Sequence, residues 1–397
     1  MPVIVPTTTL SSGQVVPANP LPSDTFEVWL DSNGYNCLVT NDLFTYPPPS
    51  SPKSSITSVL AGSRTTSSDF FGMHCQDIND IERCVSSISF DWVRTHDSGG
   101  AGGMRWFTLN PANGSFVWTN SDNWINAMVA KGKKIIFLLG FTPNWCASST
   151  PNNGKYDNGT TVTGSNQNPT NPTFFGTFAT AVATRYGSNI QAYEVWNETN
   201  YSNYWAGTAS QLAILTRVAN QAIKAVQPTA KVVGPIVQEP ETGGTGNAYL
   251  QSFLSASDGA VGTGKDWIDV CGIHMYPPKY NYQVHANQIS NVQASLTAAG
   301  VGSLEIWNTE TGVLQGDTIV NATQAKWLRR SIMLCAALGV AKYWWYSFDN
   351  DVMWMTDEDI TAWREVRAAL IGGTFSGCNI APDGRVAATI NGQRYLY

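Results

Sequence analysis

Two glutamates in this chain follow short apolar runs and could act together on one bond. Residues 192–200 read AYEVWNETN and end a Trp-Asn pair with Glu198, while residues 304–312 read LEIWNTETG and carry Glu310 shortly after a second Trp-Asn pair. Two carboxyl groups that flank a glycosidic bond can share its cleavage, one as general acid and the other as nucleophile or base. Burial and mutual repulsion separate their pKa values, so that the two groups do different jobs at one pH.

The segments around these glutamates predict a barrel of alternating strands and helices. From Phe70 onward, short apolar runs alternate with segments of helical period, which indicates repeated βα units and a parallel sheet. The predicted strands are residues 70–74, 90–96, 133–140, 190–196, 230–237, 267–276, 303–308 and 341–348. The predicted helices are residues 77–88, 121–131, 172–186, 209–226, 247–257, 284–299, 322–338 and 359–370.

Eight strands that are each followed by a helix predict an α/β fold, a (β/α)₈ TIM barrel. A doubly wound open sheet is the alternative, but the first strand runs into HCQDIND and lacks the glycine-rich phosphate loop of that fold. Active sites of barrels lie at the C-terminal ends of the strands. Glu198 follows the fourth strand and Glu310 the seventh, so both are expected at the same mouth on nearly opposite sides.

We divide the chain into three parts. Residues 1–67 form an N-terminal extension that is rich in Pro, Ser and Thr, with a predicted strand pair around Asn33-Gly34. Residues 68–372 form the catalytic barrel. Residues 373–397 form a small β appendage, with hairpin signals at Asp383-Gly384 and Asn391-Gly392.

Composition limits the partners of this protein. Only 13% of residues are charged, against about 25% in typical proteins, and the net charge is -6 without any basic block. Nucleic acid is therefore excluded as a partner, and no apolar run reaches the roughly 18 residues of a membrane helix. An uncharged polar surface with 15 Trp, 15 Tyr and 15 Phe suits a neutral, hydroxyl-rich ligand.

Location and assembly follow from the N-terminus. It shows no basic region followed by a continuous apolar region, so it does not look like a secretory signal. We expect an extracellular or particle-associated protein, with the extension as an assembly segment that supports an oligomer. Of seven cysteines, Cys75 and Cys84 are close enough in sequence to pair, and the alternative is free buried thiols.

Six ordered motifs at successive strand ends resemble clan A of the glycoside hydrolases, and most of all family 39, with family 5 as a neighbour. These motifs are VRTHD (93–97), TPNW (142–145), WNE (196–198), IHMY (273–276), WNTETG (307–312) and WYSFD (345–349). The resemblance implies a (β/α)₈ barrel, a retaining mechanism and no cofactor. It implies Glu310 as nucleophile and Glu198 as acid/base.

The resemblance also implies substrate contacts. Asn197 would hold the sugar 2-hydroxyl, and Tyr276 and His274 would line the floor, with Tyr276 donating to Glu310. His96 and Arg94 would contact sugar hydroxyls or support the nucleophile, although Arg94 could instead be buried against a carboxylate.

Two tryptophans complete the expected cleft. Trp345 would stack under the sugar, and Trp145 would line the cleft or lie in the core. Because successive residues of a strand face opposite sides, either Trp344 or Trp345 must pack against helices.

One departure from the family pattern concerns Asp97, which follows His96 directly and opens a glycine-rich loop over residues 98–103. Such a loop could widen the cleft, which favours endo action on a polysaccharide. The alternatives are a non-catalytic carbohydrate-binding barrel and a structural subunit of a polysaccharide-degrading particle. A metal site built from His74, His96, Asp97 and His274 is disfavoured, because the sequence lacks a close His pair such as HExxH.

Overall fold

The computed structural model describes most of the chain. The described residues are 63–100, 103–155, 161–239, 244–276, 282–313, 324–350, 353–380 and 385–397, with the backbone of short strands nearer the N-terminus. Those strands are β1 (Thr7–Thr9), β2 (Val15–Pro17), β3 (Phe26–Leu30), β4 (Asn36–Thr40) and β5 (Thr57–Ser58). Within these ranges, no helix has the length and apolar character needed to cross a membrane.

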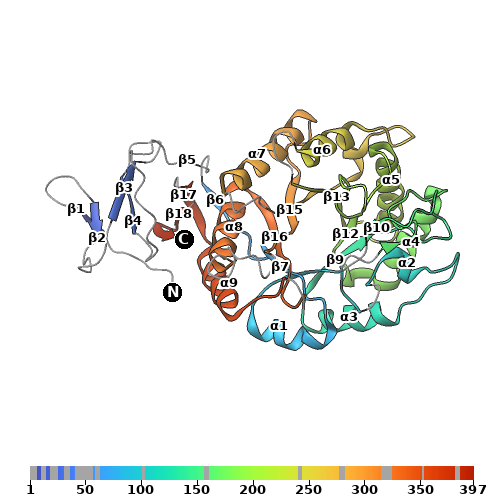
Figure 1. Ribbon diagram of the computed structural model, residues 1–397, viewed down its shortest axis with the longest axis horizontal. Coiled ribbons are helices and arrows are strands. Elements are labelled where there is room, and N and C mark those ends of the chain that lie inside the picture. Colours follow the sequence, from blue (N-terminus) through green and yellow to red (C-terminus); the bar gives the residue numbers. More distant parts are fainter. Residues whose placement is uncertain are drawn as a thin grey trace.

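Eight parallel strands close into a barrel, which confirms the predicted fold (Figure 1). Around the barrel each strand pairs with the next in chain order, and the last pairs with the first. The strands are β7 (Phe71–Met73), β8 (Trp92–Arg94), β9 (Lys134–Leu139), β12 (Ala192–Val195), β13 (Lys231–Gln238), β14 (Val270–His274), β15 (Glu305–Glu310) and β16 (Val340–Trp345). All eight fall on predicted runs.

The helices form the outer ring (Figure 1). They are α1 (Ile81–Ser87), α2 (Trp106–Leu109), α3 (Thr119–Ala130), α4 (Pro172–Tyr186), α5 (Ala209–Val226), α6 (Thr245–Ser255), α7 (Tyr282–Ala298), α8 (Gln324–Leu338) and α9 (Asp357–Leu370). The start signals act as expected: Asn171 caps α4 ahead of Pro172, and Thr208 forms a capping box at α5. The four-residue α2 and the short hairpin of β10 (Gly154–Lys155) and β11 (Thr161–Val162) were not predicted.

A separate antiparallel sheet follows the barrel, as predicted. It consists of β17 (Thr374–Ile380), β18 (Val386–Ile390) and β19 (Gln393–Leu396). Its second turn is left-handed at both central residues, with φ of 52° at Asn391 and 78° at Gly392, as a two-residue hairpin requires. The predicted turn at Asp383-Gly384 lies outside the described residues.

The N-terminal part contributes to this sheet, which the sequence did not indicate. Strands β5 and β6 (Arg64–Thr65) both pair with β17. The predicted strand pair around Asn33-Gly34 corresponds to the antiparallel strands β3 and β4.

Six cysteines are buried free thiols, among them Cys75 and Cys84, so the second of the two alternatives describes the structure. The side chain of Cys37 lies outside the described part of the chain.

Three tryptophans fill the lower half of the barrel interior, the half that lies further from the C-terminal ends of the strands. Trp92, Trp307 and Trp344 point inward from β8, β15 and β16, and their ring centroids lie 5.2 to 5.9 Å apart. Gly72 on β7 leaves room for them, because a Cβ at that position would lie 2.5 Å from the Trp344 ring. The next inward positions toward the strand ends are polar and include Arg94 and Glu194.

Gly72→Ala is expected to lower the free energy of unfolding by about 1–3 kcal/mol, because the added methyl group overpacks the barrel interior against the Trp344 ring. The free energy of unfolding from urea titration checks this. Gly377→Ala is the matched control, since it also lies on a strand but its added Cβ would approach nothing closer than 3.9 Å. Equal stability of the two variants would contradict the role assigned to Gly72.

Candidate active site

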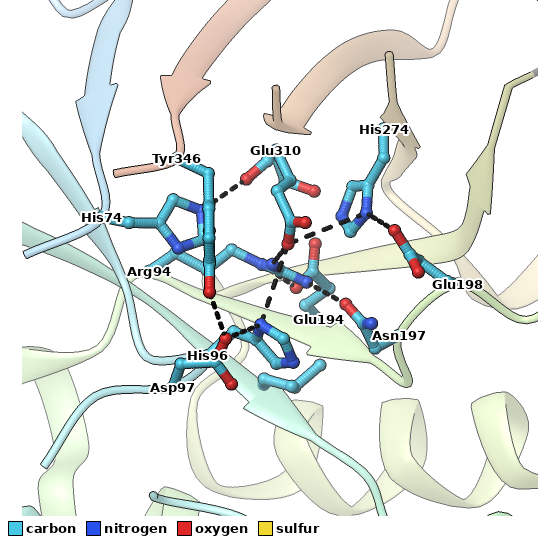
Figure 2. A network of polar contacts seen from close by, with 12 residues as sticks. His74, Arg94, His96, Asp97, Glu194, Asn197, Glu198, His274, Glu310 and Tyr346 are labelled. Carbon is cyan, nitrogen blue, oxygen red and sulfur yellow. Dashed lines mark hydrogen bonds and ion pairs between the residues drawn. The ribbon is translucent and has the colours of Figure 1, made fainter. Parts of the chain in front are cut away.

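Side chains from four strand ends converge at the C-terminal mouth of the barrel (Figure 2). Arg94 ends β8, Asn197 and Glu198 follow β12, His274 ends β14, and Glu310 ends β15. All five side chains are buried, with Glu198 at 5% and Glu310 at 7% exposure. Burial strengthens every electrostatic interaction among them.

The two glutamates lie close together. One carboxylate oxygen of Glu198 and one of Glu310 lie within 4.8 Å of each other, with the His274 imidazole in the same group. His274 Nδ1 lies 3.0 Å from Glu198 Oε1 and 3.8 Å from Glu310 Oε2. The carboxyl groups of retaining glycosidases are about 5–5.5 Å apart and those of inverting enzymes about 6.5–9.5 Å. An oxygen–oxygen separation of at most 4.8 Å is compatible with the shorter, retaining spacing.

The backbone is irregular where it presents both carboxylates. On β15 the register with β14 jumps from Asn308 to Glu310 while β14 advances by one residue, which is a β-bulge beside the nucleophile candidate. After β12 the backbone is left-handed at Trp196 (φ 68°) and at Glu198 (φ 41°). Such conformations cost about 1–3 kcal/mol each and persist where the surroundings fix them.

The Trp196 side chain holds this turn in place. Its indole donates from Nε1 to the Tyr204 carbonyl at 2.8 Å and lies edge-on against Trp205, with centroids 4.6 Å apart. The strained turn is therefore held by packing on its far side, and Glu198 is aimed at the mouth.

Arg94 joins three of the site residues. Its Nε donates to Glu194 at 2.5 Å, its Nη1 to Glu310 Oε2 at 2.7 Å and its Nη2 to Asn197 Oδ1 at 2.8 Å. The side chain is completely buried. Support of the nucleophile candidate and burial against a carboxylate thus describe the same contacts of Arg94, while its contact with sugar hydroxyls stays a prediction.

Charge and burial act on Glu310 in opposite directions. Burial raises its pKa to about 7, whereas the Arg94 guanidinium and the Tyr276 hydroxyl favour the ionised form. Tyr276 donates to Glu310 Oε1 at 2.8 Å, and burial holds its own pKa well above 10, so it stays protonated. Burial beside Arg94 holds the pKa of His274 well below its usual range, so this imidazole is neutral.

A second buried network flanks Glu310 on the β8 side. Arg105 forms an ion pair with Asp97, and Tyr346 donates to Asp97 Oδ2 at 2.7 Å. His96 Nδ1 lies 3.2 Å from Asp97 Oδ2 and 3.7 Å from Glu310 Oε2. Figure 2 shows His96 between the two carboxylates. Asp97 thus brings a further negative charge close to Glu310.

Of the two tryptophans expected in the cleft, Trp345 lies elsewhere, and Trp145 stays a prediction. Trp345 is fully buried in the outer hydrophobic cluster, as is Tyr343, whose hydroxyl donates to Ser331 on α8 at 3.0 Å. Trp345 therefore packs against the helices, and the expected sugar contact at this residue does not occur. The inward side chain at the mouth is Tyr346. Trp145 is half-buried, donates to the Asn110 carbonyl at 2.9 Å and packs edge-on against Phe174.

Several residues of the site were missed by sequence reasoning. Glu194 lies on β12, four positions before Glu198, and alternation along that strand could have indicated its inward side chain. Tyr346 lies in the WYSFD motif, but its contact with Asp97 spans 249 positions and could not be read from either segment. Arg105 lies eight positions after Asp97 in the segment between β8 and α2. Asp97 had been considered only as a metal ligand.

A metal could in principle use Glu198, His274 and Glu310, which offer one ligand atom each within 4.8 Å. Arg94 already places a cation on Glu310 Oε2 at 2.7 Å, and that positive charge opposes a second cation. The metal set that the sequence disfavours, His74, His96, Asp97 and His274, shares only His274 with this cluster.

Comparisons with known proteins agree with this geometry. A β-xylosidase of Caldicellulosiruptor saccharolyticus is 28% identical over 163 residues, which cover 39% of this chain and 32% of that protein, so the match spans about a third of the relative's length. A glucosidase from Croceicoccus marinus has a TM-score of 0.61 at 15% identity, covering 83% of this chain and 73% of that one.

A family 39 glycoside hydrolase from the gut symbiont Bacteroides cellulosilyticus WH2 also has a TM-score of 0.61, at 18% identity, covering 83% of this chain and 69% of that one. At such identities both structures establish the fold. The sequence profile of glycosyl hydrolases family 39 matches residues 71–300, which include Glu198 but end before Glu310. Because this match covers more than half of the 397 residues, the chain belongs to the glycosyl hydrolases of family 39.

Proposed function

We propose that this protein is a retaining glycoside hydrolase that cleaves a polysaccharide or oligosaccharide, with Glu310 as nucleophile and Glu198 as acid/base. The observation that carries the proposal is the separation of the two glutamates, whose nearest oxygens lie within 4.8 Å. A water molecule activated for direct attack on the sugar needs a wider gap, whereas a covalent intermediate needs this one.

Two observations bear on which glutamate does what, and they point in different directions. A pKa of about 7 for Glu310 would suit a general acid. Its contacts suit a nucleophile, because both oxygens accept hydrogen bonds, from Tyr276 at 2.8 Å and from Arg94 at 2.7 Å. A proton on either oxygen would face a donor. We give the contacts more weight, and Glu198, which faces a neutral imidazole, is then the acid.

In the proposed first step, a Glu310 oxygen bonds to the anomeric carbon while the glycosidic C–O bond breaks, and Glu198 gives its proton to the leaving oxygen. In the second step, water attacks the same carbon, Glu198 takes the water's proton, and the Glu310 carboxylate leaves. Asn197 is oriented by Arg94 through its Oδ1, which directs its amide NH₂ toward the sugar 2-hydroxyl.

The charges of the site favour a neutral sugar. The guanidinium groups of Arg94 and Arg105 already pair with Glu194, Glu310 and Asp97. The fourth carboxyl group, Glu198, lies against His274. A sugar that carries its own carboxylate would be repelled. Since a β-xylosidase is among the relatives, β-xylosides are the first substrates to test. Endo action stays part of the proposal, and the masses of early products from xylan test it.

Glu310→Gln is expected to lower kcat by at least about 10⁴-fold on p-nitrophenyl β-D-xyloside, because no covalent intermediate can form. The thermal transition should remain, since Arg94 keeps its contact with Glu194. Steady-state kinetics and calorimetry check both points. Substantial turnover by this variant would remove Glu310 as the nucleophile, and sugar binding without turnover by the wild type would favour the non-catalytic binding barrel.

Glu198→Ala is expected to behave differently from a nucleophile variant. An activated aryl leaving group needs little protonation, so the glycosyl-enzyme still forms but its hydrolysis slows by about 10²–10⁴-fold. Added azide, which needs no general base, should restore turnover and give a glycosyl azide of retained configuration. Proton NMR of the product gives the anomeric configuration. An inverted glycosyl azide would instead identify Glu198 as the nucleophile and Glu310 as the acid/base.

The pH dependence of kcat/KM reports ionisations of the free enzyme. Since Glu310 must be ionised to attack, kcat/KM should rise with pH through an acid limb near pH 7. Tyr276→Phe removes a donor to the carboxylate and should move this limb to higher pH. Asp97→Asn removes a nearby negative charge and should move it to lower pH. Shifts of the same sign in both variants would be inconsistent with Glu310 as the group that titrates.

A further inference from the structure

Trp354 is the one tryptophan that ranks as exposed in the part of the chain that the structure describes, at 44%. It lies in the loop between β16 and α9, residues 346–356. This loop leaves the C-terminal end of a barrel strand, so it belongs to the same face as Glu198 and Glu310. A single exposed apolar side chain is common on protein surfaces, so the significance of Trp354 depends on where it lies and how its backbone is held.

The backbone on both sides of Trp354 is held in place. The Ser347 amide donates to the Met353 carbonyl at 3.0 Å, and the Met355 amide to the Phe348 carbonyl at 3.2 Å. The Trp354 carbonyl accepts from Gln324 Nε2 at 3.2 Å. The next residue but one, Thr356, begins the capping box of α9. The indole is therefore exposed on a fixed backbone.

The same loop packs directly on the segment that follows Glu310. The Tyr346 amide donates to the Thr311 carbonyl at 2.7 Å. Gly312 is required there, since a Cβ at this residue would lie 1.9 Å from the Tyr346 carbonyl oxygen and 3.6 Å from Met353 Sδ. Met353, the neighbour of Trp354, thus lies beside Gly312, two residues beyond the proposed nucleophile.

The start of the loop also belongs to the site. Tyr346 binds Asp97, and Asn350 Nδ2 donates to the Tyr346 hydroxyl at 3.2 Å. One loop therefore connects the carboxylate network at the mouth with an exposed aromatic ring on the rim. The flat face of an indole suits the apolar C–H face of a pyranose, and its N–H suits a sugar hydroxyl.

We propose that Trp354 is the platform of an outer sugar subsite, which binds a pyranose of the substrate beyond the unit that is cleaved. This inference rests on the proposed function and deepens it, because it makes the substrate a neutral oligosaccharide or polysaccharide chain and not a simple glycoside. The indole takes no part in bond cleavage. It contributes affinity that grows when the chain is long enough to reach the rim.

The test measures binding without turnover. In a Glu310→Gln background, calorimetric titration with xylohexaose and with cellohexaose should give a Kd about tenfold weaker after Trp354→Ala, which is the loss expected for one aromatic contact. Trp354→Phe keeps a ring and should stay within about threefold of the parent. Val226→Ala is the control, since Val226 is a comparably exposed apolar side chain, 39%, at the far end of α5.

Kinetics separate this proposal from the proposed function. With Glu310 intact, Trp354→Ala should lower kcat/KM for the hexaose relative to that for xylobiose by a similar factor. An equal Kd for both hexaoses with and without the indole overturns the subsite, as does failure of both hexaoses to bind the parent. A different result would contradict the proposed function, namely turnover of an aryl glycoside that is retained in the Glu310→Gln variant.

Discussion

The arrangement of the site depends on one buried cation. Arg94 has no contact with solvent and cannot lose its proton, so carboxylates must surround it. It receives two, Glu194 from β12 and Glu310 from β15. Double pairing has a chemical consequence: if Glu310 becomes an uncharged ester during catalysis, Arg94 still keeps Glu194. The guanidinium therefore keeps one carboxylate partner when Glu310 loses its charge. A guanidinium paired with Glu310 alone would be left buried without a counter-charge.

The barrel interior separates packing from chemistry by depth. Its lower half is closed by three indoles that fit only because Gly72 has no side chain. Two residues beyond the inward residues Trp92, Ala192 and Trp344, the positions hold Arg94, Glu194 and Tyr346. Polar groups this deep need a rigid floor, since small shifts would break contacts of 2.5 to 2.8 Å. The strained backbone at Trp196 and Glu198 is tolerated for the same reason, because indole packing fixes it from behind.

Sequence alone was enough for the barrel and for the two glutamates, because both rest on local signals. Apolar runs mark strands, and polar residues at their ends mark the mouth. Alternation puts Trp344 and Trp345 on opposite faces of the strand without saying which faces inward. The family resemblance favoured Trp345 as the sugar contact, which is wrong. Which of the two faces inward depends on Gly72 in the neighbouring strand and on the Tyr343 contact with Ser331 of α8. A contact such as that of Tyr346 with Asp97 joins segments 249 positions apart and leaves no pattern in either.

The state of His274 is a condition for the proposed division of labour. Its Nδ1 lies 3.0 Å from Glu198 Oε1, so a charged imidazolium would hold Glu198 ionised and leave no acid for the leaving group. Burial beside Arg94 keeps this imidazole neutral. In the tautomer with the proton on Nδ1, it donates to Oε1, and the catalytic proton then resides on Oε2. After that proton has moved to the leaving oxygen, the same hydrogen bond stabilises the carboxylate, which must next act as base. Arg94 thus influences both glutamates. It forms an ion pair with Glu310, and it helps to keep His274, the neighbour of Glu198, uncharged.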